Sequence, residues 1–185
     1  GQMLARQGRL AEAKAQYELA LRCNSNSAAA HINLGKLLAS DGHVREAAAH
    51  YRLAIQARPN NAIAHYNLAN ALTALNDPSA ASHYAQAVKL RPDFAEAHYN
   101  LGLSFARQEQ MAEALKHFSE TVRLSPNSAE GHFNLGVALA KLGRYAEAIT
   151  NFQETLRWEP GNAAARKFLE HARTRQKQGL APPEP

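Results

Sequence analysis

The sequence predicts an all-α protein built as an α-solenoid, in which antiparallel helix pairs stack on one another. A His-x-Asn-Leu motif recurs four times, and its asparagines at positions 33, 67, 100 and 134 are 34, 33 and 34 residues apart. Each repeat holds two segments with helical apolar periodicity, joined by about three residues, and such short links make neighbouring helices antiparallel. A unit of this size cannot bury its apolar face alone, so it must stack on the next unit.

A single array is predicted over residues 1–178, and its first unit is incomplete. Aligning Gly8 with Gly42 places Gly1 opposite Gly35, in the middle of a first helix, so we expect the parent chain to continue upstream. A terminal helix closes the array, as a solenoid requires. The expected segments are a partial repeat (1–27), four full repeats (28–61, 62–94, 95–128 and 129–162), the capping helix (163–178) and a disordered Pro-rich tail (179–185).

Residues of the second repeat predict where its two helices begin and end. Ser27 or Asn26 can cap the helix that begins at Ala28, because their side-chain oxygens accept from free N–H groups. Gly42 ends that helix, and Pro59 stops the one that follows. The third repeat is one residue shorter, and Asn76-Asp77-Pro78 replaces its glycine-containing inner turn.

Apolar residues recur at fixed positions and predict the core. One leucine marks each first helix, and one alanine and one aromatic residue mark each second helix. Fully buried, each of the larger side chains stabilises the fold by roughly 1.5 to 3 kcal/mol. Trp158 is expected to pack against the capping helix. The three ladders are Leu34, Leu68, Leu101 and Leu135; Ala13, Ala47, Ala80, Ala114 and Ala148; and Tyr17, Tyr51, Tyr84, Phe118 and Phe152.

Composition limits the class of protein. Hydrophobic residues make up 45% and charged residues 20%, as in a folded soluble chain. No apolar run reaches the roughly 18 to 20 residues of a membrane span. The single cysteine, Cys23, excludes an internal disulfide framework. The net charge is +5, and the last helix is the most basic part of the chain. We interpret this helix as a solvated cap and expect no nucleic-acid partner. No signal peptide is visible, and the location is open, with a slight preference for the cytoplasm.

These residues together resemble the tetratricopeptide repeat (TPR) family. Leu-Gly in the first helix, Ala early in the second, then an aromatic, a small residue and a closing Pro match its pattern over residues 1 to about 162. One position differs throughout, because His31, His65, His98 and His132 replace a bulky residue that is often Trp in the family. The resemblance implies a right-handed superhelix whose first helices line a concave groove where peptides bind.

An aromatic and an asparagine follow three of the four histidines and predict a binding surface in that groove. Asparagine can donate to and accept from the backbone of one extended chain, and aromatics supply apolar pockets. The row resembles that of the superhelical repeats of O-GlcNAc transferase and of many bacterial TPR proteins, although asparagine is also common at this position for structural reasons. The candidate peptide-binding residues are Asn33, Asn67, Asn100, Asn134, Tyr66, Tyr99, Phe133, Lys36 and Asn70.

Other kinds of site find less support. Chaperone-binding TPR proteins clamp a carboxylate with Lys, Asn and Arg, and here only Asn67 matches while Glu96 would repel a carboxylate. Histidines on successive first helices lie at least about 10 Å apart, too far to share a zinc ion, and those on second helices fail for the same reason. No phosphate loop, nucleophile elbow or metal motif appears, so neither a catalytic residue nor a cofactor is expected.

The sequence therefore favours a non-catalytic scaffold that binds a peptide or protein segment in the concave groove. Two alternatives stay open. The array could be the substrate-recognition or regulatory arm of a larger enzyme, for example a glycosyltransferase. It could also self-associate through the truncated first helix, which exposes Met3, Leu4 and Leu10.

Overall fold

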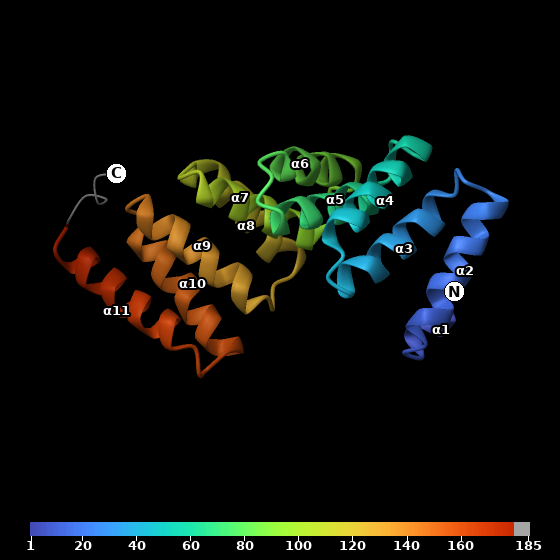
Figure 1. The fold of residues 1–185 in the computed structure, drawn as a ribbon. Coiled ribbons are helices and arrows are strands. Elements are labelled where there is room, and N and C mark those ends of the chain that lie inside the picture. The colour runs from blue at the N-terminus through green and yellow to red at the C-terminus, as the bar shows by residue number, and fades with distance from the viewer. Residues whose placement is uncertain (180–185) are drawn as a thin grey trace. The chain divides into compact units, whose positions relative to one another are not determined.

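The structure, a computed structural model, describes residues 1–179, which form eleven α-helices and no strand (Figure 1). The chain divides into two compact units, Gly1–Pro92 and Asp93–Pro185. The predicted tail falls almost wholly on residues 180–185, outside the described part. The first unit holds α1 (Gln2–Arg6), α2 (Leu10–Cys23), α3 (Ala28–Ser40), α4 (Val44–Ala57), α5 (Ala62–Ala74) and α6 (Ala80–Leu90). The second holds α7 (Ala95–Arg107), α8 (Met111–Leu124), α9 (Ala129–Lys141), α10 (Tyr145–Trp158) and α11 (Ala163–Lys177).

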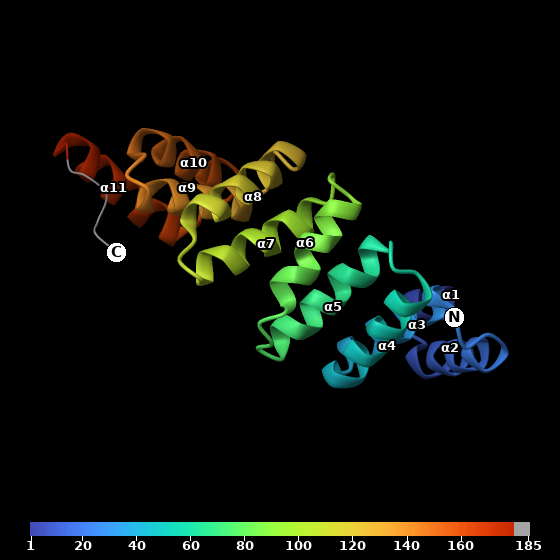
Figure 2. The ribbon, with the colours of Figure 1, turned by 90° about the horizontal axis from the view of Figure 1, so that it is seen from above.

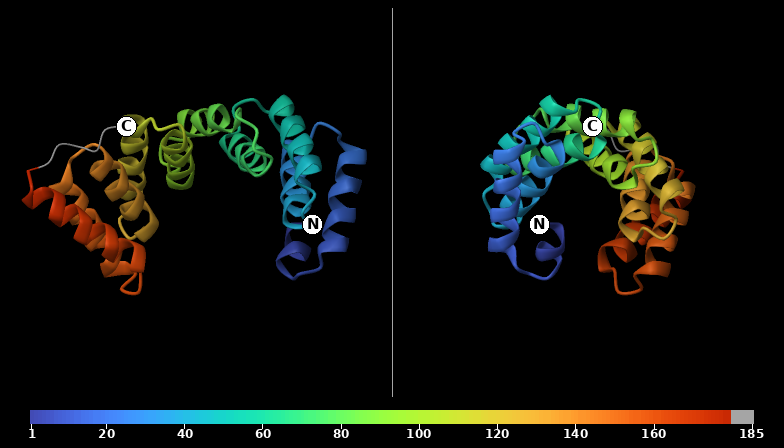
Figure 3. Two further views of the ribbon diagram at one scale, coloured as in Figure 1. Left: turned by 60° about the vertical axis from the view of Figure 1, so that its left-hand side comes forward. Right: turned by 90° about the vertical axis from the view of Figure 1, so that its right-hand side faces the viewer.

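Within each unit the helices pack as consecutive pairs. In the first unit α3 packs on α4 and α5 on α6, and α4 also packs on α5 of the next pair (Figure 2). In the second unit α7 packs on α8 and α9 on α10, and α11 covers α10 (Figure 3). The prediction of an all-α solenoid of helix pairs is confirmed.

Short polar side chains begin most of the first helices. Ser27 Oγ accepts from the Ala30 N–H at 3.4 Å, as predicted, and Asn61 Oδ1 accepts from the Ala64 N–H at 3.0 Å. Ser128 caps α9 and Asn162 caps α11 in the same way. Each cap satisfies one of the N–H groups that lack a partner in the first turn, which fixes where the helix starts.

Every inner turn contains one residue with a left-handed backbone. Gly42 has φ of 84°, and glycine adopts this conformation without a steric cost. In the third and fourth repeats the same place is taken by Asn76 (φ 56°) and Glu109 (φ 60°). The third repeat therefore keeps the turn, and its missing residue lies later, between Asn76 and Tyr84, where α6 begins.

The predicted ladders form the core. All members of the leucine, alanine and aromatic series are buried, and Phe118 and Phe152 are among the largest side chains with almost no exposure. In the second unit a continuous cluster joins Phe118 of α8, Leu135 of α9, Phe152 of α10 and Leu169 of α11. Trp158 is not part of this cluster, and its side chain is 47% exposed. That it packs against the capping helix stays a prediction.

Glycine lets each first helix approach the ring of its own second helix. A methyl group on Gly35 would lie 2.6 Å from Cε1 of Tyr51, and one on Gly136 would lie 2.7 Å from Cε1 of Phe152. Gly102 has the same relation to Phe118, and Gly1 to Tyr17. Gly1 thus occupies the position that its alignment with Gly35 predicts.

Candidate functional site

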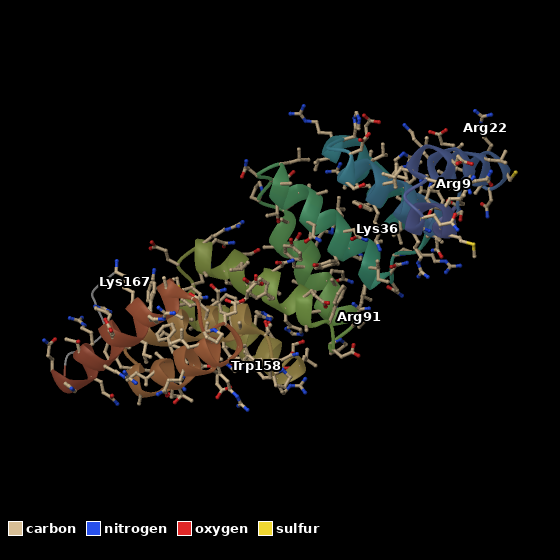
Figure 4. All side chains as sticks on the ribbon, turned by 90° about the horizontal axis from the view of Figure 1, so that it is seen from below. Arg9, Arg22, Lys36, Arg91, Trp158 and Lys167 are labelled. Carbon is tan, nitrogen blue, oxygen red and sulfur yellow. The ribbon has the colours of Figure 1, made fainter. Side chains whose placement is uncertain are left out.

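Two candidate residues of the first unit, Asn33 and Lys36, lie together at a cleft beside α3. This cleft, of about 360 Å³, is formed by residues of α1, α2 and α3, and includes the predicted Asn33 and Lys36. Its apolar wall is formed by Leu10, Tyr17 and Leu37, and Ser40 adds a hydroxyl group. Figure 4 marks Lys36, one turn after Asn33 on the same helix. Sequence reasoning predicted these two residues but not the cleft itself, because the packing of α1 decides its shape.

The charge of this cleft is positive. Arg6 and Lys36 both line it, and neither forms an ion pair with any residue in the described part of the chain. The first helices of this unit, α1, α3 and α5, contain no acidic residue. The lining of the cleft thus includes two cations and no carboxylate, which favours an anion there.

The candidate residues on α5 are partly used within the fold. Tyr84 Oη donates to Asn70 Oδ1 at 2.6 Å, and the Tyr66 ring packs on the Tyr84 ring with centroids 6.0 Å apart. Asn67 differs, because its Nδ2 is buried and has no hydrogen-bond partner among the described residues. A buried amide without a partner costs on the order of 1 to 3 kcal/mol. Because this nitrogen is buried, it can contact a ligand only after a side-chain movement.

In the second unit the candidate residues connect two repeats. Asn134 Nδ2 donates to Tyr99 Oη at 3.1 Å and to the Glu130 carbonyl at 3.0 Å. Burial is the main cause that raises the pKa of Tyr99; the nearby Glu130 carboxylate adds to the rise and the Asn134 hydrogen bond opposes it. Asn134 thus holds α9 to α7, and its oxygen is the atom left for a ligand. Asn100 lies one position after Tyr99 on α7.

The aromatic candidates of this unit are half-buried rather than open to solvent. Tyr99 packs on Phe118 with ring centroids 6.1 Å apart. Phe133 packs on Phe152 at 6.0 Å and meets Phe168 of the capping helix edge-on at 5.6 Å. We therefore expect these rings to offer an edge, not a deep pocket, to a bound chain.

Sequence reasoning missed a set of histidine pairs. In three repeats the first-helix histidine lies against a histidine of the second helix, with the two Nδ1 atoms 3.0 to 3.1 Å apart. The pairs are His31–His50, His65–His83 and His98–His117. Comparing successive repeats could not reveal these pairs. The spacing within a repeat could, because the paired histidines are 19, 18 and 19 residues apart and packed aromatic pairs such as Tyr66–Tyr84 and Tyr99–Phe118 are spaced in the same way.

No group of three or more His, Cys, Asp or Glu side chains within residues 1–179 could hold a metal ion. Cys23 is exposed and unbonded. Over the same residues, no helix is both long enough and apolar enough to cross a membrane.

Fold and sequence together define a scaffold of stacked helix pairs with a repeat of about 34 residues. The chain belongs to the tetratricopeptide repeat family: two models of this repeat match it, one over residues 1–62, 32–81 and 66–129 and the other over residues 129–162. Such arrays are protein–protein interaction scaffolds. No curated protein sequence matches the chain.

Several solved TPR structures are similar over most of their length. YrrB, described as a TPR protein with an unusual peptide-binding site, is 25% identical with a TM-score of 0.76, covering 94% of this chain and 88% of YrrB. MamA from Desulfovibrio magneticus RS-1 is 23% identical with a TM-score of 0.75, covering 88% and 92%. Pseudomonas aeruginosa PilF is 21% identical with a TM-score of 0.78, covering 96% and 87%. The last two establish a common fold only.

Proposed function

We propose that this protein is a non-catalytic scaffold that binds an extended peptide or protein segment on the face of its first helices. The observation that carries the proposal is the cleft beside α3, where Asn33 and Lys36 line one hollow together with Tyr17 and Leu37. Asparagine offers both a donor and an acceptor to a peptide backbone, and the apolar wall can hold a side chain. The peptide-binding site of YrrB supports the proposal by similarity.

The charge of the cleft defines the class of segment. Arg6 and Lys36 carry positive charge and have no carboxylate partner among the described residues. The segment should therefore contain an acidic residue next to an apolar one, so that the carboxylate reaches Lys36 while the apolar side chain covers Leu37. Because both cations are exposed, the attraction should weaken as salt is added.

A peptide array tests this proposal directly. We expect the purified protein to retain acidic peptides over their Lys-substituted counterparts, and Lys36→Glu to lose at least about tenfold in affinity, equivalent to roughly 1.4 kcal/mol. Lys14→Glu is the matched control, since Lys14 is exposed on α2 and does not line the cleft. Equal binding by Lys36→Glu and wild type would exclude the cleft as the site.

The asparagine row needs a separate variant. Asn67→Ala with Asn100→Ala should weaken peptide binding while the helical circular dichroism and the thermal midpoint stay close to wild type. Unfolding of this double variant would show that the row is structural. Peptides that bind the double variant as well as wild type would move the site away from these residues.

Self-association is a second candidate, favoured by the exposed apolar side chains of α1 and α2. Met3 is 74% exposed and Leu10 47%, and Leu19 is also open. A mass that falls on dilution in light scattering, and Met3→Ser with Leu10→Ser as a monomeric variant, would support it. The hypothesis of an arm of a larger enzyme stays a prediction.

A further inference from the structure

The tautomers of two histidine pairs follow from their other hydrogen bonds. His31 Nε2 lies 3.0 Å from the Ser25 carbonyl oxygen, and His65 Nε2 lies 3.0 Å from that of Pro59. A carbonyl oxygen only accepts, so each Nε2 carries the hydrogen, and in the neutral ring Nδ1 is then bare. The bare Nδ1 of His31 must accept from an Nδ1–H of His50, and that of His65 from an Nδ1–H of His83.

The geometry suits a shared hydrogen rather than a metal ion. Ring centroids within the pairs lie 5.2 to 5.4 Å apart while the nitrogens are 3.0 to 3.1 Å apart, so the two Nδ1 atoms face each other nearly head-on. A zinc ion in line between them, at ~2.0 to 2.1 Å from each, would need the nitrogens about 4 Å apart. The observed distance is that of an N–H···N bond.

We propose that the three histidine pairs are proton-sensitive locks, each closed while it carries at most one added proton and opened when both imidazoles are protonated. The first added proton can enter at Nε2 of the second-helix histidine and leave the Nδ1–H···Nδ1 bond in place. The second must enter at the bare Nδ1 of the first-helix histidine. Two N–H groups, each on a cationic ring, would then point at one another, and the rings must separate.

The locks of the second and third repeats each join three segments of chain. The first-helix histidine of the second and third repeats bonds the turn that enters the repeat and, through its other nitrogen, the second helix. Opening a pair therefore loosens both the helix pair and its junction with the preceding repeat. This inference does not depend on which ligand the protein binds.

The surroundings of the second-helix histidines favour their neutral form. Burial, and next the facing imidazole, lowers the pKa of His50, His83 and His117. The carboxylates Glu46 and Glu18 near His50, Asp77 near His83, and Glu113 and Glu120 near His117 oppose this lowering. Arg52 near His83 and Lys116 near His117 add to it, and Phe105 stacks on the His117 ring at 5.6 Å.

The sign of the pH effect follows from linkage. A lowered pKa means that the folded state binds the proton less tightly than the unfolded state does. The stabilisation that comes from a neutral second-helix histidine is thus fully present above the ordinary histidine pKa of about 6.5 and is lost as the pH falls through the lower folded value. This loss accompanies the first proton, and the second proton, which opens the pair, adds to it. Carboxylates titrate mainly below about pH 4.5, so the change in stability caused by histidine protonation occurs at a higher pH than the change caused by carboxylate protonation.

The fifth repeat is a natural control, because Asn151 stands where the second, third and fourth repeats have the second histidine. His132 Nδ1 lies 2.9 Å from Asn151 Oδ1, and its Nε2 lies 3.0 Å from the Pro126 carbonyl. The Asn151 Nδ2 donates to the Glu147 carbonyl, which turns the amide oxygen towards the histidine. This arrangement can hold a protonated imidazole with both N–H groups bonded.

Nuclear magnetic resonance of the wild-type protein tests the locked state. In long-range ¹H–¹⁵N spectra at about pH 7.5, where histidine is mainly neutral, His31 and His65 should be Nε2–H tautomers and His50 and His83 Nδ1–H tautomers. The second pattern is diagnostic, because only the pairing requires a hydrogen on Nδ1. Nε2–H tautomers at His50 and His83 would overturn the proposal.

Variants that copy the fifth repeat test the opening. We expect the thermal midpoint to fall between about pH 7.5 and 5.5, and His50→Asn with His83→Asn and His117→Asn to reduce that fall at least by half. Asn151→His should enlarge it, and His171→Asn, an exposed histidine on α11, should leave it unchanged. An unchanged fall in the triple variant would refute the locks; should that variant not fold, Asn151→His and the tautomers decide.

Discussion

The contact between the two helices of the third repeat differs from that in the second, fourth and fifth repeats. In those three, a glycine lies under the aromatic ring of the second helix, with no room for a methyl group. In the third repeat Ala69 occupies the position, fully buried, and the ring belongs to Tyr84. Its hydroxyl donates to Asn70 Oδ1 and lies 3.3 Å from Thr73 Oγ1.

This difference shows how one missing residue is accommodated. The third repeat lacks a residue between the left-handed Asn76 and Tyr84, and α6 is 11 residues long where the other complete second helices have 14. Helix α6 starts later, so its ring meets the first helix at a changed place, where a methyl group fits and polar groups hold the hydroxyl. In the third repeat the close packing of a ring on glycine is thus partly replaced by the hydrogen bonds of the Tyr84 hydroxyl group.

The largest effect should follow from removing an aromatic ring of a second helix that packs on a glycine of the first helix, an arrangement that we call a glycine crossing. Phe152 is fully buried between α9 and α11, so Phe152→Ala should cost about 3 to 5 kcal/mol of unfolding free energy. Urea denaturation followed by circular dichroism would measure it. Phe168→Ala, a change of the same kind at a ring 38% exposed, is the control and should cost clearly less. Equal losses would mean that the crossing has no special weight.

Filling the glycine position should have the next largest effect. Gly136→Ala pushes a methyl group against Phe152, and overpacking of this kind costs about 1 to 3 kcal/mol. In a Phe152→Leu background the same change should cost less, because the ring edge is gone. Gly161→Ala has no atom within 4 Å of the new methyl group and serves as the control. A Gly136→Ala protein as stable as wild type would show that Phe152 moves aside freely.

The smallest effect should come from the hydroxyl group of the third repeat. Tyr84→Phe removes its hydrogen bonds to Asn70 and Thr73 and should cost about 0.5 to 1.5 kcal/mol. Tyr51→Phe is the matched change at a glycine crossing; burial raises the pKa of Tyr51 to about 12, and its ring contributes by packing. We expect a smaller loss there. Comparable losses would remove the distinction between the two crossings.

Repetition made the fold predictable, but not every contact. A position filled five times by Ala, or by Tyr and Phe, indicates a shared structural role, and these ladders are buried as predicted. Trp158 occurs once, and unlike the ladder residues it is half-exposed, at the end of α10 with the Arg157 guanidinium 5.5 Å from its ring centre. The His–His contacts escaped prediction because they join two helices of one repeat, a relation that comparing equivalent positions does not reveal.

The candidate binding site was predictable only as a list of residues. Asn33 and Lys36 are neighbours on one helix turn, so their proximity follows from sequence. The cleft that they share with Arg6 depends on how α1 packs. Nor does the sequence indicate that the Asn134 amide nitrogen donates a hydrogen bond to Tyr99, 35 residues earlier in the chain.

Packing between consecutive helices also governs how the protein folds. The main helix contacts within each unit join elements next to each other, or next but one, along the chain. Chains dominated by such local contacts close short loops and fold in microseconds to milliseconds. Helix α1 has no buried residue and α2 has two, whereas α4 has four and α5 has six. Amide hydrogens of α1 and α2 should therefore exchange with solvent before those of α4 and α5.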